Sequence, residues 1–266
     1  MNVFATGTSG TIGRHLQSMV MPVNLDLGEL SSIPMANFPK ESHLIHLAGV
    51  VGPVAVLADE QKSYLVNVSA TLKLAEVFKT KSQGKFTYVS TSHVYSPTSD
   101  EIFESSPVSP PNPYAQQKLD AEVQLNDLFM DSPERLCIVR VFSVLDWDVA
   151  PFTLGGGVRK LTQEDSDYTL TNSEDIRDFL TPNMIAQSLL EIAITESAFG
   201  VLNLCSGTGI SVGDAARKML SESGVLVPEN RIIPGHSSNP VIVGSNSKLR
   251  SILPNLALKW TPSRLD

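Results

Sequence analysis

The sequence predicts an α/β fold, a doubly wound parallel sheet with helices on both faces and a smaller carboxyl-terminal part. Three observations lead to this prediction. Short apolar runs alternate with longer helical patterns, as they do in parallel sheets. A glycine-rich turn follows the first apolar run, and a cluster of hydroxyl side chains follows a later one. Parallel sheets bind ligands at the carboxyl ends of their strands, where we expect both features to lie.

The first apolar run covers residues 3–6 and leads into a turn that contains Gly7, Gly10 and Gly13. Glycines at this spacing let the backbone turn tightly, approach a pyrophosphate and pack a helix against the sheet. We expect that helix to have only about two turns, over residues 14–21 before Pro22, with its amino end facing the phosphates. The turn therefore predicts a dinucleotide site in a Rossmann-like fold. The candidate cofactor contacts in the turn are Gly7, Ser9, Gly10, Thr11, Ile12 and Gly13.

Residues 23–27 are predicted to form a short second strand that contains Asp26. In dinucleotide folds an acidic residue about 20 positions after the glycines binds the adenosine ribose. Asp26 follows the glycines at a shorter distance, so three interpretations stay open. It is a ribose acid on a shortened unit, an aspartate that belongs to the next strand of the fold and lies beside the adenine, or a solvated turn aspartate. The sequence does not choose between NAD and NADP.

Later apolar runs predict further strands, and amphipathic patterns predict the helices between them. The strands are expected near residues 42–48, 86–88, 136–142 and 201–205, and the helices near residues 54–80, from residue 113 onward and over 183–195. His46 lies in one of these apolar strands, where a core histidine is the expected role.

The helix that begins near residue 113 carries Tyr114 and Lys118 one turn apart on one face. A phenol titrates near ~10, and a nearby ammonium favours the phenolate and lowers that pKa. Taken alone, this spacing occurs on many solvated helix faces. Thr91 ends a predicted strand, so its hydroxyl can donate to a substrate carbonyl in the same crevice.

Together, the glycine turn, Thr91 and the Tyr114–Lys118 pair resemble the extended short-chain dehydrogenase/reductase family. The similar group is the NAD-dependent epimerases and dehydratases that act on nucleotide sugars. The resemblance implies that Tyr114 is the general acid/base, that Lys118 lowers its pKa and holds the nicotinamide ribose, and that Thr91 bonds the sugar oxygen. The further cofactor contacts that it implies are Leu47, Ala48, Gly49, Asn67, Tyr114 and Lys118, and the implied substrate contacts are Ser92, His93, Ser143 and Arg177.

Several of these implied contacts have alternatives. Asn67 is equally explained as an exposed helix residue, and Arg177 as the partner of Asp175 or Asp178 in a structural salt bridge. Ser143 stands where the family often has an asparagine. A second family arginine is absent, and His236 lies near its place.

The resemblance also implies a division of the chain. Residues 1–148 are predicted to be mainly the dinucleotide-binding domain, and residues 149–266 mainly the substrate-binding part. Residues near 183–205 are expected to return to the first domain.

The expected function is an NAD(P)-dependent oxidoreductase that reduces a 4-keto group on a nucleotide-activated sugar. An NAD-dependent nucleotide-sugar epimerase is the alternative. Dehydratases of the family have Asp-Glu after the threonine, whereas this chain has Ser92 and His93, which argues against dehydration. A more remote alternative is a non-catalytic dinucleotide sensor, because a fold does not fix a function.

Composition bears on several other classes. The 266 residues carry a net charge of −8, which gives no basic footprint for nucleic acid. Cys137 and Cys205 show no metal-like spacing, so reduced buried thiols and no metal site are expected. No apolar run approaches the ~20 residues of a membrane span, and no signal sequence is apparent. We expect a cytoplasmic protein without membrane contact, and a homodimer remains open as its assembly.

Overall fold

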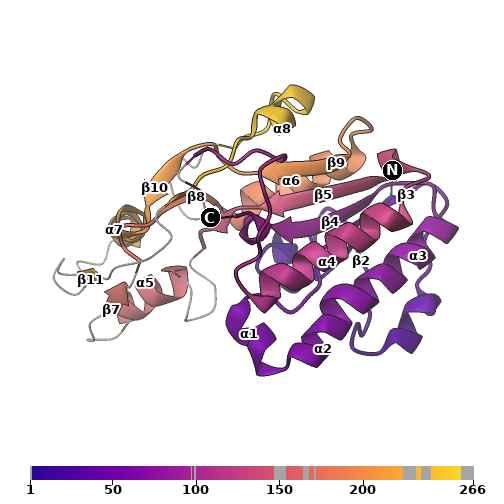
Figure 1. Ribbon diagram of the computed structural model, residues 1–266, viewed down its shortest axis with the longest axis horizontal. Helices are drawn as coiled ribbons and strands as arrows, with labels where there is room; N and C mark the ends of the chain where they lie inside the picture. Colours follow the sequence, from indigo (N-terminus) through magenta and orange to yellow (C-terminus); the bar gives the residue numbers. More distant parts are fainter. Residues whose placement is uncertain are drawn as a thin grey trace.

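The computed structural model describes residues 2–96, 98, 100–146, 154–163, 168–170, 172–223, 232–234 and 241–258. Its largest unit is a six-stranded sheet in the order β2-β1-β3-β4-β5-β9, in which every neighbouring pair is parallel. The six strands are β1 (Asn2–Thr6), β2 (Met21–Pro22), β3 (Ser42–His46), β4 (Phe86–Thr91), β5 (Leu136–Val141) and β9 (Gly200–Leu204). Helices cover both faces (Figure 1), and the predicted α/β class is confirmed.

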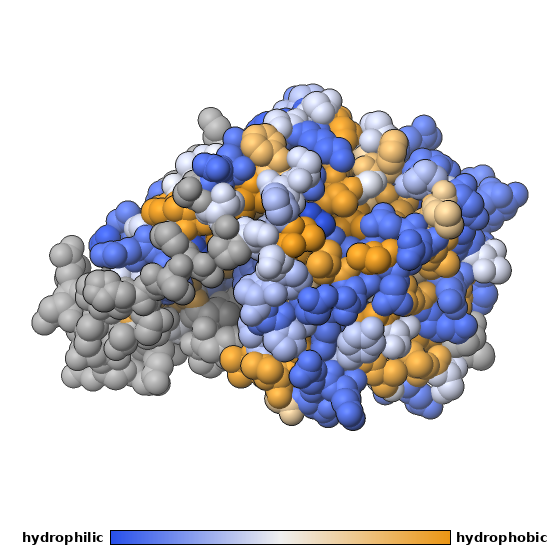
Figure 2. Space-filling model, in the orientation of Figure 1, coloured by the Kyte–Doolittle hydropathy of each residue, from blue (hydrophilic) through white to orange (hydrophobic). Residues whose placement is uncertain are grey.

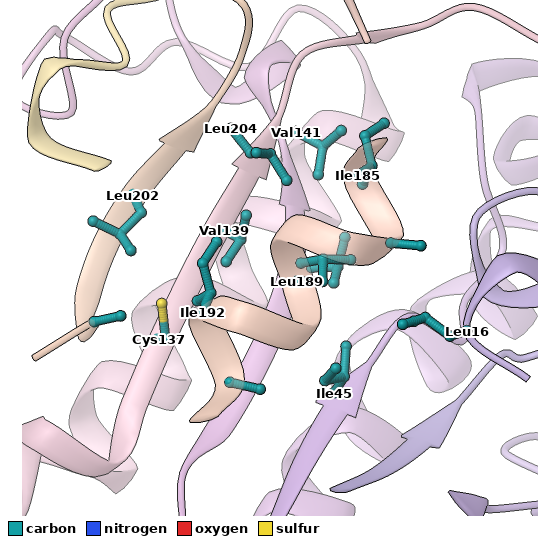
Figure 3. Close-up of a cluster of buried hydrophobic side chains, with 14 of the residues drawn as sticks. Leu16, Ile45, Cys137, Val139, Val141, Ile185, Leu189, Ile192, Leu202 and Leu204 are labelled. Atoms are coloured by element: carbon teal, nitrogen blue, oxygen red, sulfur yellow. The ribbon is translucent and has the colours of Figure 1, made fainter. Parts of the chain in front are cut away.

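Helix α6 (Pro182–Ile194) covers one face of this sheet. Ile185, Leu189 and Ile192 are fully buried there among apolar side chains of β5 and β9, as Figure 3 shows. Each such side chain contributes about 1.5–3 kcal/mol by leaving water. The opposite face is covered by α3 (Thr71–Lys81) and α4 (Pro113–Leu128). Because both faces are buried, the central strands are continuous apolar runs in the sequence.

The connection between β1 and β2 differs from the prediction. A single 3-10 turn, η1 (Gly13–His15), stands where a helix over residues 14–21 was expected. A parallel crossover needs a dozen or more residues, and the glycine turn already takes up the first part of the connection between Thr6 and Met21. The predicted strand over residues 23–27 is also wrong, because β2 ends at Pro22 and only the Val23 amide continues the pairing, to the Ala5 carbonyl at 2.7 Å.

The predicted helix over residues 54–80 is present as four consecutive helical segments. They are α1 (Pro53–Ala58), α2 (Glu60–Tyr64), the π-helical η3 (Leu65–Ala70) and α3. Asp59 interrupts the series with an extended backbone, and its carboxylate accepts a hydrogen bond from the Lys62 amide at 2.9 Å. Around α1, the side chains of Val54 and Leu57 are exposed, and Figure 2 shows an apolar area at this place on a mostly hydrophilic face.

A second, smaller sheet lies beside the carboxyl ends of the main strands (Figure 1). It contains β6 (Ser143–Val144), β8 (Ile176–Leu180), β10 (Gly209–Ser211) and β12 (Val241–Ile242), while β7 (Tyr168–Leu170) pairs with β11 (Ile232–Pro234). The remaining helices are α5 (Leu154–Gln163), α7 (Val212–Ser223) and α8 (Ser247–Ile252). Buried Asp178 of β8 accepts backbone amides of Ser206 and Gly207 at 2.7 and 2.9 Å, which joins β8 to the segment after β9. Among the helices of the described residues, none has the length and apolar character needed to span a membrane.

Candidate active site

The three glycines of the turn after β1 have different structural roles. Gly7 has a φ of 71°, and a Cβ there would lie 2.6 Å from the Ala48 nitrogen. A Cβ on Gly13 would lie 2.0 Å from the Gly7 carbonyl oxygen, so a side chain is excluded at both positions. At Gly10 the nearest atom would be the same oxygen at 3.4 Å, an ordinary contact. The protein itself therefore leaves space above Gly10, where a dinucleotide phosphate is expected to approach.

A cavity of about 500 Å³ lies beside this turn. It is lined by Thr6, Gly7, Thr8, Ser9, Val23, Asn24, Leu25, Asp26, Leu27 and Ala48. Asp26 therefore reaches the predicted cofactor site despite its unusual spacing, because the chain runs from β2 past the glycine turn. Its carboxylate accepts the Gly28 amide at 2.9 Å and is otherwise exposed to the cavity side. The cavity fits the adenosine end of a dinucleotide in size and polarity.

The other predicted cofactor contacts lie outside this lining. Ile12 and Leu47 are partly buried and pack against the core beneath α6. Gly10, Thr11, Gly13 and Gly49 complete the turn and the loop after β3. The expected helix amino end at the phosphates is reduced to one 3-10 turn, so backbone amides of the turn, more than a helix dipole, are left to bind phosphate.

Thr91, Tyr114 and Lys118 come together where β4 meets the start of α4. Thr91 is the last residue of β4, and α4 is capped by Asn112, whose side-chain oxygen accepts the Ala115 amide at 3.0 Å. The three predicted catalytic side chains are 8%, 7% and 5% exposed, in the order named. The Thr91 side chain lies close enough to Tyr114 to lower its pKa, which places the two hydroxyl groups near one another.

The protonation of Tyr114 differs from the expectation based on its lysine neighbour. Burial raises the pKa of Tyr114 to about 12, and the hydrogen bond with Thr91 lowers it only in part. Lys118 donates to the Val89 carbonyl at 2.8 Å, and its Nζ lies 4.6 Å from the centroid of the Tyr88 ring. Burial lowers the pKa of Lys118 to about 8, with Glu122 acting in the opposite direction. In this geometry burial dominates the pKa of the phenol, and Thr91 is the neighbour that acts against it.

Asn67 is buried in the π-helical segment η3, so the interpretation as an exposed helix residue is wrong. Its side chain accepts the Val50 amide at 2.7 Å and donates to the Val50 carbonyl at 3.0 Å. It also donates to Gln117 of α4 at 2.9 Å, and Gln117 donates to Ser63 at 3.0 Å. Asn67 therefore fixes the loop after β3 to the helix that carries Tyr114. Gln117 was not identified from the sequence, although it stands beside Lys118.

His93 lies beside Tyr114, and Arg177 is close enough to His93 for its charge to affect the histidine. The His93 ring is exposed and stands edge-on to the Tyr114 ring, with centroids 6.3 Å apart. The surrounding protein, and then the Arg177 charge, lower the pKa of His93, which places Arg177 near the same site. Arg177 also pairs with Asp175 at 2.5 Å, so the salt bridge considered from the sequence is present with Asp175.

The remaining predicted substrate contacts are less directly placed. Ser92 is buried in the short turn after Thr91, and Ser143 is partly buried at the start of β6, opposite Phe179 of β8. His236 lies outside the described residues. Within the described part of the chain, no group of three or more metal-ligating side chains is found.

The fold and the glycine turn define the class: a dinucleotide-binding α/β protein of the Rossmann type. The model of the NAD dependent epimerase/dehydratase family matches residues 21–181, which is more than half of the chain. The chain belongs to this family. It is an enzyme of the nucleotide-sugar reductase or epimerase kind, and its cofactor is NAD or NADP.

Individual relatives are more distant. GDP-6-deoxy-D-mannose reductase of Pseudomonas aeruginosa is 27% identical over 226 residues, covering 77% of this chain and 74% of that protein. UDP-glucose 4-epimerase 2 of Oryza sativa subsp. japonica is 26% identical over 213 residues, covering 70% of this chain and 52% of that protein. A solved structure described as RMD from Pseudomonas aeruginosa complexed with NADPH has a TM-score of 0.86 at 22% identity, covering 98% of this chain and 93% of that one. At that identity the likeness shows the fold alone.

The glycine geometry gives the first testable prediction. Gly10→Val is expected to weaken dinucleotide binding at least about tenfold, ~1.4 kcal/mol, because its side chain would occupy the space for the phosphates. Gly13→Ala is the contrasting variant, since its Cβ collides with the Gly7 backbone and should lower the melting temperature. Calorimetry with NADH and thermal unfolding of both variants measure the two effects. Unchanged affinity in Gly10→Val would remove the turn from the cofactor site.

Proposed function

We propose that this enzyme is a reductase that converts a keto group of a nucleotide-activated sugar, at the sugar C4, into an alcohol. The observation that carries the proposal is the buried contact of Thr91 with Tyr114, one helical turn from Lys118 and at the carboxyl end of β4. The similarity to GDP-6-deoxy-D-mannose reductase supports the sugar-nucleotide substrate class.

In the proposed reaction Thr91 and Tyr114 bind the carbonyl oxygen of the substrate with their hydroxyl groups. When bound, the reduced nicotinamide supplies the hydride to the carbonyl carbon. Tyr114 transfers its phenolic proton to the oxygen, which becomes the alcohol. The Lys118 ammonium, held at the Val89 carbonyl, stabilises the negative charge that this transfer leaves on Tyr114.

The raised pKa of Tyr114 fits its proposed role as the proton donor in a reduction. A phenol with a pKa of about 12 is protonated at neutral pH, which is the form that donates a proton to a carbonyl oxygen. An epimerase begins in the opposite sense, because its base must first take a proton from a sugar hydroxyl.

The lining of the cavity supports NADH as the preferred cofactor. Among the described residues that line it, Asp26 carries the one charge, and no lysine or arginine is present. A carboxylate at this place suits a free ribose hydroxyl and repels the phosphate that NADP carries there. This preference differs from the NADPH named for the Pseudomonas aeruginosa structure.

Epimerisation is the second candidate function. The same acidic lining also suits the NAD that an epimerase retains, and one relative is a UDP-glucose 4-epimerase, of which this chain spans about half. The two candidates differ in the fate of the cofactor: a reductase releases it oxidised after each turnover, whereas an epimerase keeps it.

Cofactor turnover therefore separates the two functions. Incubation with GDP- and UDP-linked 4-keto sugars is expected to oxidise NADH stoichiometrically, and more efficiently than NADPH, as followed by absorbance. Freshly purified protein, once denatured, should release far less than one NAD per chain. Stoichiometric NAD in the supernatant, together with substrate conversion that consumes no added cofactor, would establish the epimerase instead.

Tyr114→Phe tests the proposed acid. Turnover is expected to fall by roughly 10²- to 10⁴-fold, since the proton donor is lost while the ring stays in place. NADH affinity should remain close to that of the wild type, because the cavity around Asp26 is unchanged. Wild-type turnover in this variant would exclude Tyr114 from proton transfer.

Arg177→Ala tests the proposed contact with the substrate diphosphate. The KM for the nucleotide sugar is expected to rise more than kcat falls, because a remote phosphate contact is equally strong in the ground and transition states. Asp175→Asn is the matched control, since it breaks the salt bridge and keeps the guanidinium. If both variants lose thermal stability and neither changes KM, Arg177 is structural only.

A further inference from the structure

Successive residues at the end of β4 contact residues spaced four apart on α4. Thr91 lies beside Tyr114, the Val89 carbonyl accepts a hydrogen bond from Lys118, and the Ser90 hydroxyl donates to a Glu122 carboxylate oxygen. Two of these contacts belong to the proposed catalytic set. The third places a buried carboxylate one helical turn beyond Lys118, on the same face of the same helix.

Glu122 is held rigidly by Arg140 of β5. The Arg140 guanidinium donates to both carboxylate oxygens, with its Nε 3.2 and 3.1 Å from Oε1 and Oε2 and its Nη2 2.6 Å from Oε2. The Glu122 side chain is 3% exposed and the Arg140 side chain is 7% exposed. On the other side, the guanidinium carbon lies 4.6 Å from the centroid of the Tyr95 ring, and Tyr95 donates to Asn203 of β9 at 2.6 Å.

Stability alone is a weak explanation for this pair. Burying two charges costs free energy that their attraction often fails to recover, and apolar replacements of similar volume are frequently as stable. The position of the pair is more informative, because Glu122 lies between the Arg140 guanidinium and the helical turn that carries Lys118.

We propose that Glu122 is a positioning residue that keeps the buried Lys118 side chain charged beside Tyr114, with Arg140 and Ser90 fixing the carboxylate for this purpose. The inference rests on the proposed function in giving Lys118 a catalytic role. Without the carboxylate, burial would drive Lys118 toward the neutral amine, which offers the phenolate no charge. Glu122 already acts to raise the pKa of Lys118 against the larger effect of burial.

The groups around Lys118 make its titration separable from theirs. The titratable side chains near Lys118 are Tyr114 and Glu122 of α4, Tyr88 of β4 and His46 of β3. Burial, and then the Lys118 charge, lower the pKa of His46 to about 3, and burial raises that of Tyr114 to about 12. Burial also raises the pKa of Tyr88 well above 10. Lys118 is therefore the member of this group that titrates between pH 8 and its ordinary value of 10.5.

The test measures this titration through stability, with neither substrate nor cofactor present. Lys118 has a lower pKa in the folded protein than in the unfolded chain, so the unfolded chain binds more protons between the two values. The wild type should gain stability relative to Lys118→Met as pH rises from about 8 to 10.5. The pH at which the gain begins reports the folded pKa of Lys118.

The same comparison is then made in a Glu122→Gln background, with and without Lys118→Met. We expect the gain to begin about one pH unit lower, because the neutral amide no longer favours the ammonium. Ser90→Ala is the matched control: it removes a hydrogen bond to the carboxylate and no charge, so the onset should stay near the wild-type value. An onset unchanged by Glu122→Gln would overturn the proposal.

A second background covers the case in which Glu122→Gln fails to fold. Glu122→Met with Arg140→Met removes both charges and leaves no buried ion unpaired, and the onset should again move to lower pH. An unchanged onset here would equally overturn the proposal. If chemical denaturation shows the shift but no nucleotide sugar is turned over, the positioning role of Glu122 stands and only the proposed reaction fails.

Discussion

The packing of α4 against the end of β4 is the constraint on which the rest of the site depends. A helix advances about 6 Å over four residues, and a strand advances about 3.3 Å per residue, so the two elements keep register over only a few positions. Asn112 and the helix start fix where Tyr114 falls, and Thr91 ends the strand at the same level. A shift of one residue in either element would turn the phenol away from the threonine. Asn67 and Gln117 add to this constraint by joining the helix to the loop after β3.

Much of this arrangement is predictable from the sequence. The central strands are mostly apolar runs because both of their faces are buried. Thr91, Tyr114 and Lys118 stand out because, together with the glycine turn, they resemble the site of a known family. The first crossover is not predictable in the same way. Residues 14–21 have an amphipathic local pattern, but the short chain between the glycines and β2 leaves no room for a full helix. Asp26 reaches the cavity through the path of the chain and not through its spacing from the glycines.

The buried polar residues are the part that sequence reasoning missed. A glutamate such as Glu122 on an amphipathic helix predicts a solvated face, and only the fold shows it buried and paired with Arg140. The signal that was available is Arg140, a charge inside an apolar strand, which requires a buried partner. The direction of the Tyr114 pKa shift was also missed, since its neighbour in sequence predicts a lowering and its burial, visible only in three dimensions, dominates.

The short strand β2 has a consequence for how the protein behaves at high concentration. An exposed sheet edge is a template on which another chain can add a strand, the first step of aggregation. At this edge β2 offers two residues, and one of them, Pro22, has no amide hydrogen to donate. At the opposite edge Lys248 of α8 donates to the Val201 carbonyl of β9 at 2.7 Å and occupies one of the acceptors there. The two edges of the sheet are thus protected by different means, one by brevity and proline, the other by a covering lysine.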